Sequence, residues 1–457
     1  MSPTSTADPR VRPSTFGALR IRNYRLHSLA NLVSITGTWM QVVAQNWMVL
    51  ELTGSTTALG ASVGIQALPT VALSLWGGVL ADRVDRRRLL MAIHLGHAVL
   101  ALTLVVLAVG GLHSVAPLLL ISFLSGSLSA IEAPASGSFA TELVPPALLG
   151  SAIALGSAIS SAGRVVGMAL AGVLVASFGA APVFALNAAS YLVAIGGLAG
   201  LRASELQPAP RVPRAPGQLR EGLRYVLADR ELIVLFALAW FLSGFGRNFQ
   251  VTMAAMTAGP LGTGASGYGQ ASMVFAVGAF VGAFAAARAG ASTRKVLVLA
   301  SLAAAVGQAV AGMAPGMGTF LVALAPAAVG AVIIDTAVNS LAQLGSHESI
   351  RGRVLSVLGL VGTSATAFGG PALGWVGDRL GARASLVVGA AVAATATLVA
   401  VKVWRGEARA QAVSATSPAR RAPRSAATSA TATALTSTRP ASPATEVAAL
   451  PESPLMA

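Results

Sequence analysis

Twelve long stretches of apolar residues recur along the chain, and they limit its possible folds more than any other feature. A helix that crosses the hydrocarbon core of a bilayer needs about 20 mostly apolar residues. The stretches lie near residues 28–50, 57–80, 89–110, 115–139, 150–178, 181–201, 231–256, 267–289, 295–313, 317–341, 354–376 and 384–404. Because lipid offers no partner to backbone amides, such stretches fold as helices. The sequence therefore predicts an all-α, polytopic membrane protein with twelve transmembrane helices.

The composition supports this class and argues against soluble ones. Only 10% of the residues are charged and 54% are hydrophobic, whereas soluble domains have roughly 25% charged residues. A net charge of +15 would suggest a nucleic-acid ligand in a soluble protein, but basic cytoplasmic loops explain it without one. Since the chain has no cysteine, disulfides and thiolate metal sites are excluded. We therefore expect the protein to lie in the lipid bilayer and to have no nucleic-acid partner.

The basic residues also predict an orientation. With the N-terminus in the cytoplasm, most of the 31 Lys and Arg fall in the two tails and the even-numbered connections. This asymmetry predicts that both termini are cytoplasmic. Residues 1–27 contain no apolar core, so they are not expected to be a cleavable signal peptide. The richness in Ala, Gly and Arg suggests a bacterial source, and hence a multi-pass protein of the bacterial cytoplasmic (inner or plasma) membrane.

Five regions follow from this pattern. Residues 1–27 are predicted to form a cytoplasmic N-terminal segment, 28–201 an N-terminal six-helix bundle, 202–230 a cytoplasmic linker and 231–404 a C-terminal six-helix bundle. Residues 405–457 are rich in Ala, Ser, Thr, Pro and Arg and lack apolar periodicity. That composition predicts a disordered cytoplasmic tail.

The two predicted bundles carry signs of duplication. A single offset places Glu132 of the fourth span on Asp335 of the tenth. The same offset places Gly167-Met168-Ala169-Leu170-Ala171-Gly172 of the fifth span on Gly370-Pro371-Ala372-Leu373-Gly374-Trp375 of the eleventh. A shared offset across several spans indicates two pseudo-symmetric bundles. Membrane proteins built from such parallel repeats place their binding site between the repeats.

Four ionisable residues, Glu132, Arg164, Arg247 and Asp335, lie inside predicted spans. A charge at the centre of a membrane helix costs about 2.5–3.5 kcal/mol, so each is a candidate for function. A buried carboxyl group is less costly when protonated or paired, which makes Glu132 and Asp335 candidates for proton coupling. The alternative is a structural ion pair between helices, such as Glu132 with Arg164.

Other polar residues gather in the first, seventh and tenth spans. Together with the two arginines they are candidates for lining a substrate pathway. The full set of pathway candidates is Gln41, Gln45, Asn46, Arg164, Arg247, Asn248 and Asn339.

The connection after the second span carries the most specific motif, Gly78-Val79-Leu80-Ala81-Asp82-Arg83-Val84-Asp85-Arg86-Arg87-Arg88. It resembles the cytoplasmic loop motif of the major facilitator superfamily, Gly-x-Leu-Ala-Asp-Arg-x-Gly-Arg-Arg, except that Asp85 replaces the second Gly. The resemblance implies a gating role for Gly78, Asp82, Arg83, Arg86 and Arg87. An ordinary basic loop would explain the arginines but not Asp82. The superfamily's fold also implies that the first, fourth, seventh and tenth spans line a central cavity.

Further segments resemble one bacterial branch of that superfamily, which contains the enterobactin exporter and macrolide-efflux-type permeases. They are Ile131-Glu132-Ala133-Pro134-Ala135, Asn187-Ala188-Ala189-Ser190-Tyr191, Glu221-Gly222-Leu223-Arg224-Tyr225 and Arg351-Gly352-Arg353-Val354. The resemblance implies export of a drug or siderophore, commonly driven by protons.

The fifth span, from Gly163 through Gly167 to Gly172, looks like a degenerate antiporter motif in which Met168 replaces the Pro. Close packing of helices through small residues explains it equally well. His94 and His97 lie one turn apart, and without a carboxylate nearby we expect a packed pair rather than a zinc site. No phosphate-binding loop, catalytic constellation or metal-ligand set is present, so we expect no cofactor and no enzymatic activity.

These features together predict a secondary active transporter that exports a small molecule by alternating access, with proton antiport. Its expected partners are the small-molecule substrate, protons and lipid. A proton-coupled uptake symporter and a non-transporting membrane sensor or scaffold remain alternatives. The sequence is compatible with a monomer and leaves the oligomeric state open.

Overall fold

The computed structural model describes residues 16–111, 113–207, 218–289, 293–347 and 350–416. It describes no side chains at residues 74–79, 81–82, 218–219, 287, 289 and 407–416. Met1–Trp404 form one compact unit and Arg405–Ala457 a second. Most of the predicted N-terminal segment, up to residue 15, and most of the predicted tail, from residue 417, lie outside the described residues.

Six long helices form the first half of the larger unit. They are α1 (Arg22–Thr53), α2 (Thr56–Arg83), α3 (Arg86–Val109), α4 (Ala116–Glu142), α5 (Leu149–Phe178) and α6 (Ala180–Ala199), with short 3-10 turns η1 (Gly17–Arg20), η2 (Pro146–Leu148) and η3 (Ala203–Glu205). Local signals set their ends. Gly54 ends α1 with a left-handed φ of 61°, and the Ser55 side chain accepts a hydrogen bond from the Ala58 amide at the start of α2.

The second half repeats this order after a short amphipathic helix, α7 (Gln218–Ala228), within the predicted linker. Its elements are α8 (Arg230–Phe241), η4 (Leu242–Gly246), α9 (Phe249–Ala258), α10 (Gly264–Ala289), α11 (Arg294–Gly312), α12 (Met317–Leu344), α13 (Arg351–Leu380) and α14 (Ala382–Thr416). The predicted span 231–256 corresponds to one apolar segment, Arg230–Ala258, within which the π-helical turn η4 separates α8 from α9.

Eleven of the described helical segments are long and apolar enough to cross a membrane, counting α8 through α9 as one. Helix α1 is not among them, because polar residues such as Gln41, Gln45 and Asn46 lower its mean hydropathy. It is nevertheless 32 residues long and packs against α5 and α6. The described residues form helices and no strands, and the predicted all-α polytopic fold class is confirmed.

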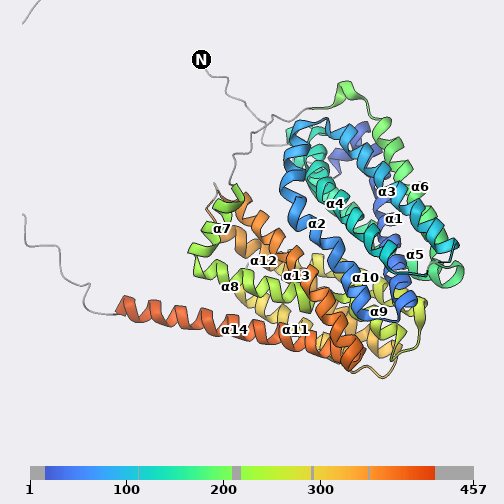
Figure 1. Ribbon diagram of the computed structural model, residues 1–457. Coiled ribbons are helices and arrows are strands. Elements are labelled where there is room, and N and C mark those ends of the chain that lie inside the picture. The colour runs from blue at the N-terminus through green and yellow to red at the C-terminus, as the bar shows by residue number, and fades with distance from the viewer. Residues whose placement is uncertain (1–15, 112, 208–217, 290–292, 348–349, 417–457) are drawn as a thin grey trace, which may run out of the picture. The chain divides into compact units, whose positions relative to one another are not determined.

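The long helices alternate in direction, which defines two ends of the unit. We call the end where α1 begins the first end and the end where α1 finishes the second end. The two halves meet along two helix pairs, α2 with α13 and α5 with α10, and Figure 1 shows α2 running beside α13. Close approach depends on glycine: a Cβ at Gly60 would overlap the Gly370 backbone, and one at Gly172 would overlap Gly269. All four glycines lie toward the second end.

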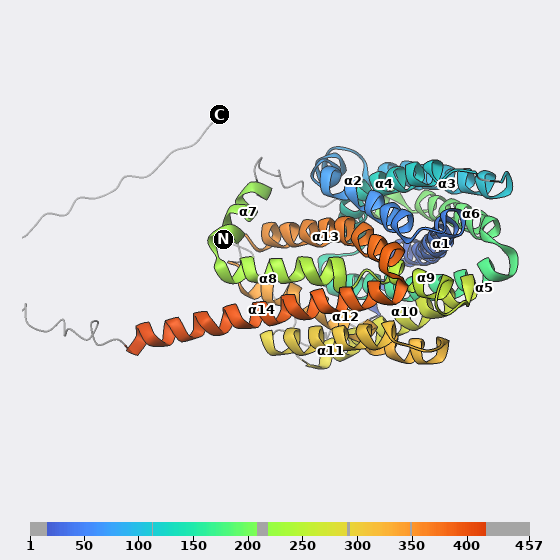
Figure 2. The same ribbon diagram turned by 60° about the horizontal axis from the view of Figure 1, so that its bottom comes forward.

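A core of buried side chains also joins the halves toward the second end. It includes Met40 and Val49 of α1 together with Phe249, Met256 and Tyr268 of the second half. Among the described residues, these contacts between the halves lie toward the second end. Figure 2 shows the same unit with α8 and α14 side by side.

Candidate functional site

A cavity of about 770 Å³ lies between α1, α4 and α5, in the parts of these helices near the first end. Its walls carry hydroxyl and amide groups, among them Ser28, Asn31 and Ser157. The same walls carry two of the predicted site residues, Glu132 and Arg164. The fold therefore brings together a carboxylate and a guanidinium that are 32 positions apart in sequence.

Glu132 lies against the two histidines of α3. Its Oε2 is 3.2 Å from Nε2 of His97 and its Oε1 is 4.0 Å from Nδ1 of His94. Both histidines are buried, with 7% and 6% exposure for His94 and His97, and both rings stack on Tyr191 of α6. The expectation that no carboxylate lies near this pair was wrong, because α3 and α4 pack side by side. Among the described residues no group of His, Asp or Glu is arranged to hold a metal ion.

Arg164 does not pair with Glu132 or with any other acidic residue in the part of the chain that is described. Its guanidinium carbon lies 5.8 Å from the centre of the Trp39 ring, within the range of a cation–π contact. Glu132 uses His97 instead. The structural ion pair between Glu132 and Arg164, which the sequence left as an alternative, is therefore not formed in this conformation.

Asp335 of α12 forms an ion pair with Arg247. Arg247 follows the π-helical turn η4, and its guanidinium also donates to Ser243 at 3.0 Å and to the Ala331 carbonyl at 3.4 Å. The turn forms where Gly244 packs directly against the α13 backbone, and Gln308 donates to its Phe245 carbonyl at 3.2 Å. Such helix breaks within the membrane are common at functional sites. Here the break positions Arg247 to face α12.

The uncharged pathway candidates of α1 are buried and already hydrogen-bonded. Gln41 accepts from Asn187 at 2.7 Å, Gln45 donates to Ser122 at 2.8 Å, and Asn46 donates to Gln250 of the second half at 3.2 Å. In this conformation all three line a small polar chamber beside His97.

The remaining two candidates differ in their surroundings. Asn248 is buried, and its Nδ2 has no hydrogen-bond partner among the described residues. Asn339 is exposed and donates to the backbone carbonyl of Asp335 at 2.9 Å. Neither contacts Glu132 or Arg164, whereas Asp335 lies close enough to Arg164 to attract its charge.

The loop between α2 and α3 anchors the first end of the first half. Arg86 pairs with Glu142 at the end of α4, and Arg87 donates to the Leu198 and Ala199 carbonyls at the end of α6, both at 2.8 Å. Asp85 stands where the superfamily motif has Gly because it caps α3, accepting from the Arg88 amide at 2.9 Å. Arg83 is exposed. At Gly78 and Asp82 only the helical backbone is described, and nothing of the Asp82 side chain.

A carboxylate that the sequence analysis missed joins the halves at the second end. Asp378, near the end of α13, accepts from the amides of Thr56 and Thr57 and from the hydroxyls of Ser55 and Thr56, at 2.6–3.0 Å. These donors form the N-terminus of α2, where a negative charge is favoured by the helix dipole. One signal was available: Gly374-x-x-x-Asp378-Arg379 repeats the spelling of Gly78-x-x-x-Asp82-Arg83.

The stretch resembling an antiporter motif packs closely against its neighbours. A Cβ at Gly163 would meet Ile35, one at Gly167 would overlap the Thr36 carbonyl, and one at Gly172 would overlap Gly269 of α10. This is the packing through small residues that the sequence left open. Gly163 and Gly167 thus pack on α1 of the same half, and Gly172 packs on α10 of the other half.

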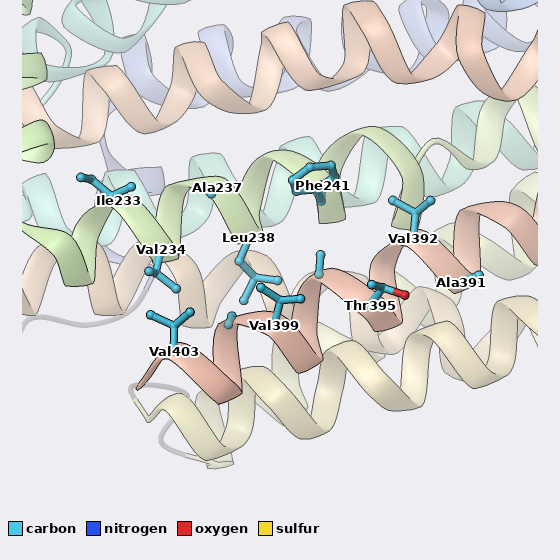
Figure 3. Close-up of a pocket in the computed structure, with 12 residues that line it drawn as sticks. Ile233, Val234, Ala237, Leu238, Phe241, Ala391, Val392, Thr395, Val399 and Val403 are labelled. Atoms are coloured by element: carbon cyan, nitrogen blue, oxygen red, sulfur yellow. The ribbon is translucent and has the colours of Figure 1, made fainter. Parts of the chain in front are cut away.

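A second cavity, of about 570 Å³, lies between α8 and α14 (Figure 3). Apart from the Thr395 hydroxyl its walls are hydrocarbon side chains, such as Leu238, Phe241 and Val399. With no charge or amide to orient a polar molecule, this groove has the character of a lipid-facing surface. We assign no substrate to it.

Comparison with known protein families identifies the family of this chain. The chain belongs to the transmembrane secretion effector family of the major facilitator superfamily, whose model matches residues 13–428. It is therefore a multi-pass membrane transporter of that superfamily.

Two relatives share a shorter stretch. The chain is 29% identical over 160 residues to the staphyloferrin A transporter of Staphylococcus aureus, covering 35% of this chain and 40% of that protein. It is 26% identical over 162 residues to YfiS, an uncharacterised MFS-type transporter of Bacillus subtilis, covering 35% and 38%. The chain thus matches less than half the length of either relative.

Solved structures show the same fold at low sequence identity. A bacterial homologue of the human lysosomal transporter Spinster superposes with a TM-score of 0.66 and 18% identity, covering 86% of this chain and 98% of that one. A nucleoside transporter gives a TM-score of 0.69 with 10% identity, covering 83% and 99%. A bacterial homologue of the iron transporter ferroportin gives 0.64 with 18% identity, covering 83% and 98%.

Proposed function

We propose that the protein exports a drug-like or siderophore-like small molecule by alternating access, in exchange for protons. The family description, a secretion effector, and the relative named as a staphyloferrin A transporter support export of such a cargo. The cavity of about 770 Å³ has the size of small-molecule sites, roughly 300–1,000 Å³.

The observation that carries the proton coupling is the contact of Glu132 with His97 on the wall of this cavity. An isolated carboxylate is costly inside a membrane bundle. One added proton relieves that cost, because the pair becomes either an ion pair or a neutral acid beside a neutral imidazole. Imidazole is the side chain that gains and loses protons near neutral pH. The pair therefore suits the binding and release of one proton per cycle.

A small polar chamber of about 30 Å³ continues from His97 toward the middle of the bundle. It is lined by Gln45, Ser125 and Tyr191, among others, and it has room for about one water molecule. The Ser125 hydroxyl is buried and has no hydrogen-bond partner among the described residues. A chamber of this size supports a proton path that reaches Glu132 from the side of Asn46, separate from the substrate cavity.

The contacts between the halves support alternation. Asp378 and the paired glycines hold the halves together at the second end, whereas the polar cavity lies near the first end. Rocking the halves about the midplane would exchange these roles. With the first end in the cytoplasm, as the basic loops predict, this conformation receives cargo from inside.

Accumulation in inside-out vesicles tests the proposal. Vesicles from cells that produce the protein should accumulate a candidate siderophore or drug when their interior is acidified, and collapse of the pH gradient should abolish accumulation. Loss of preloaded cargo under the same gradient would indicate uptake symport. No flux in either direction, from protein confirmed to be folded, would leave the sensor or scaffold alternative and overturn the proposal.

Reporter fusions test the orientation independently. Fusions after Arg87, Arg214 and Lys402 should report a cytoplasmic location, and fusions after His113, Gly179, Gly259 and Gly316 an external one. An external report at Arg214 would contradict the proposed orientation, because the two halves would no longer share it.

A further inference from the structure

The cavity between α1, α4 and α5 holds a guanidinium that forms no ion pair with a described residue. Arg164 is the one Arg or Lys among the residues lining this cavity, and no described residue donates to it, accepts from it or forms an ion pair with it. The other arginine inside the spans, Arg247, is paired with Asp335. Arg164 is half-buried among these helices, and a guanidinium in such a place is stabilised by an anionic partner that accepts hydrogen bonds from its N–H groups. Arg164 lies over the face of Trp39, and Asp335 of the second half attracts it without forming an ion pair.

Hydroxyl groups surround this charge. Ser160 lies one helical turn before Arg164 on α5, with Ser157 and Ser161 beside it, and all three line the cavity. None of these hydroxyls hydrogen-bonds another described residue. Ser136 of α4 adds a hydroxyl from the facing wall. A ligand seated here meets one fixed positive charge and several groups that donate or accept hydrogen bonds.

Resting on the proposed function, we infer that the cargo is a hydroxycarboxylate: its carboxylate binds Arg164, and its hydroxyl groups bind the serines of α5 and α4. One guanidinium matches one carboxylate in charge and in planar geometry. Glu132, on the same cavity wall, repels a second anionic group placed beside it. Arg164 repels a cationic compound that has no carboxylate. The site should therefore bind the hydroxycarboxylate in preference to cationic drugs.

The chain allows a direct binding test because it has no cysteine. A Gly156→Cys variant places one thiol in the cavity wall, where an added Cβ meets no atom within 4 Å. A Gly318→Cys variant places one at an exposed site near the second end, where a Cβ is equally free. The rate of maleimide labelling is then measured in purified full-length protein, with no membrane gradient.

Three probes differ only at one carbon: lactobionate carries a carboxylate, lactitol a hydroxymethyl group and 1-amino-1-deoxylactitol an ammonium. Lactobionate should slow labelling of Gly156→Cys, and the other two should not. None should affect Gly318→Cys. Adding Arg164→Gln should raise the lactobionate concentration for half-protection by about tenfold or more, the loss of a charge-assisted hydrogen bond. Arg164→Lys should retain part of the protection, which separates loss of charge from loss of folding.

Equal protection by lactitol, or full protection in folded Arg164→Gln protein, would overturn the inference. Best protection by the ammonium probe would indicate a cation site, and no protection by any probe would show that the cavity takes no hydroxycarboxylate. Because this assay needs neither flux nor protons, its failure is distinguishable from a failure of proton-driven export in vesicles.

Discussion

The two halves of the protein place a carboxylate at related positions but surround it differently. In the first half Glu132 contacts His97 and lies near His94, and an imidazole can be neutral or carry a proton as a cation. In the second half Asp335 pairs with Arg247, which keeps its charge under all physiological conditions. The difference teaches that a duplicated helix framework fixes where a carboxylate lies, while neighbouring helices decide whether it is switchable or fixed.

The largest expected effect is at the switchable carboxylate. Glu132→Gln removes the partner of both histidines, so proton-driven accumulation in inside-out vesicles should fall by roughly 10- to 100-fold, the range of typical coupling between two ligands. Exchange of labelled for unlabelled cargo without a gradient should continue. Glu205→Gln, the same substitution at an exposed residue outside the spans, is the matched control and should keep gradient-driven accumulation. Normal accumulation by Glu132→Gln would refute its role in coupling.

At the fixed pair, loss of one charge should weaken both coupling and stability. Arg247→Gln and Asp335→Asn should each lower proton-driven export and destabilise the protein by about 1 kcal/mol, since the exposure of Asp335 screens the pair. The double variant should regain most of the stability, measured as the melting temperature in detergent. If Asp335→Asn uncouples as strongly as Glu132→Gln with no loss of stability, the contrast between the halves is wrong.

Asp378 permits a test of the contact between the halves. Asp378→Asn replaces a charged acceptor of four hydrogen bonds, so closure at the second end should weaken by about 1–2 kcal/mol. A thiol introduced by Ser62→Cys, buried in α2, should then react faster with an impermeant maleimide added from the second-end side. Arg379→Gln, the exposed neighbour, should leave the rate unchanged. A rate unaltered by Asp378→Asn would show that Asp378 does not hold this end closed.

Asp82 should act in the opposite sense. If it braces the first end when that end is closed, as the superfamily motif implies, Asp82→Asn favours the conformation seen here. Labelling of Ser62→Cys should slow, and transport should fall several-fold while the protein still inserts, a smaller effect than at Glu132. Faster labelling would show that Asp82 and Asp378 stabilise the same conformation, which would contradict their proposed opposite effects.

The smallest effect is expected at the tail. Deletion from Ala412 onward removes residues of the second unit without apolar periodicity, so transport should stay within about twofold of the full chain. A larger loss at normal membrane abundance would assign the tail a role in regulation or partner binding.

The sequence determined the helices and the importance of their charged residues. Stretches long enough to cross a bilayer fold in one way only, because lipid forces backbone hydrogen bonds to close within the segment. The cost of a charge in a span likewise marked Glu132, Arg164, Arg247 and Asp335 before any contact was known. The break at η4 was not foreseen, because it arises from the packing of Gly244 on α13.

Tertiary structure alone decided the partners. His97 and Glu132 lie on different helices, and the spacing of residues along the chain does not reveal which sides of those helices face each other. Asp378 caps a helix more than 300 positions earlier in the sequence. The buried amides of α1 were foreseen as polar residues of a pathway, yet their bonds to Asn187, Ser122 and Gln250 belong to one packing of the two halves. Hydrophobic periodicity and composition describe one segment at a time, whereas ion pairs, helix caps and cavities depend on which segments pack together. For this reason the sequence predicted a membrane transporter with charges in its spans, and the structure decided which of them lies beside histidines, which forms an ion pair and which faces a cavity without one.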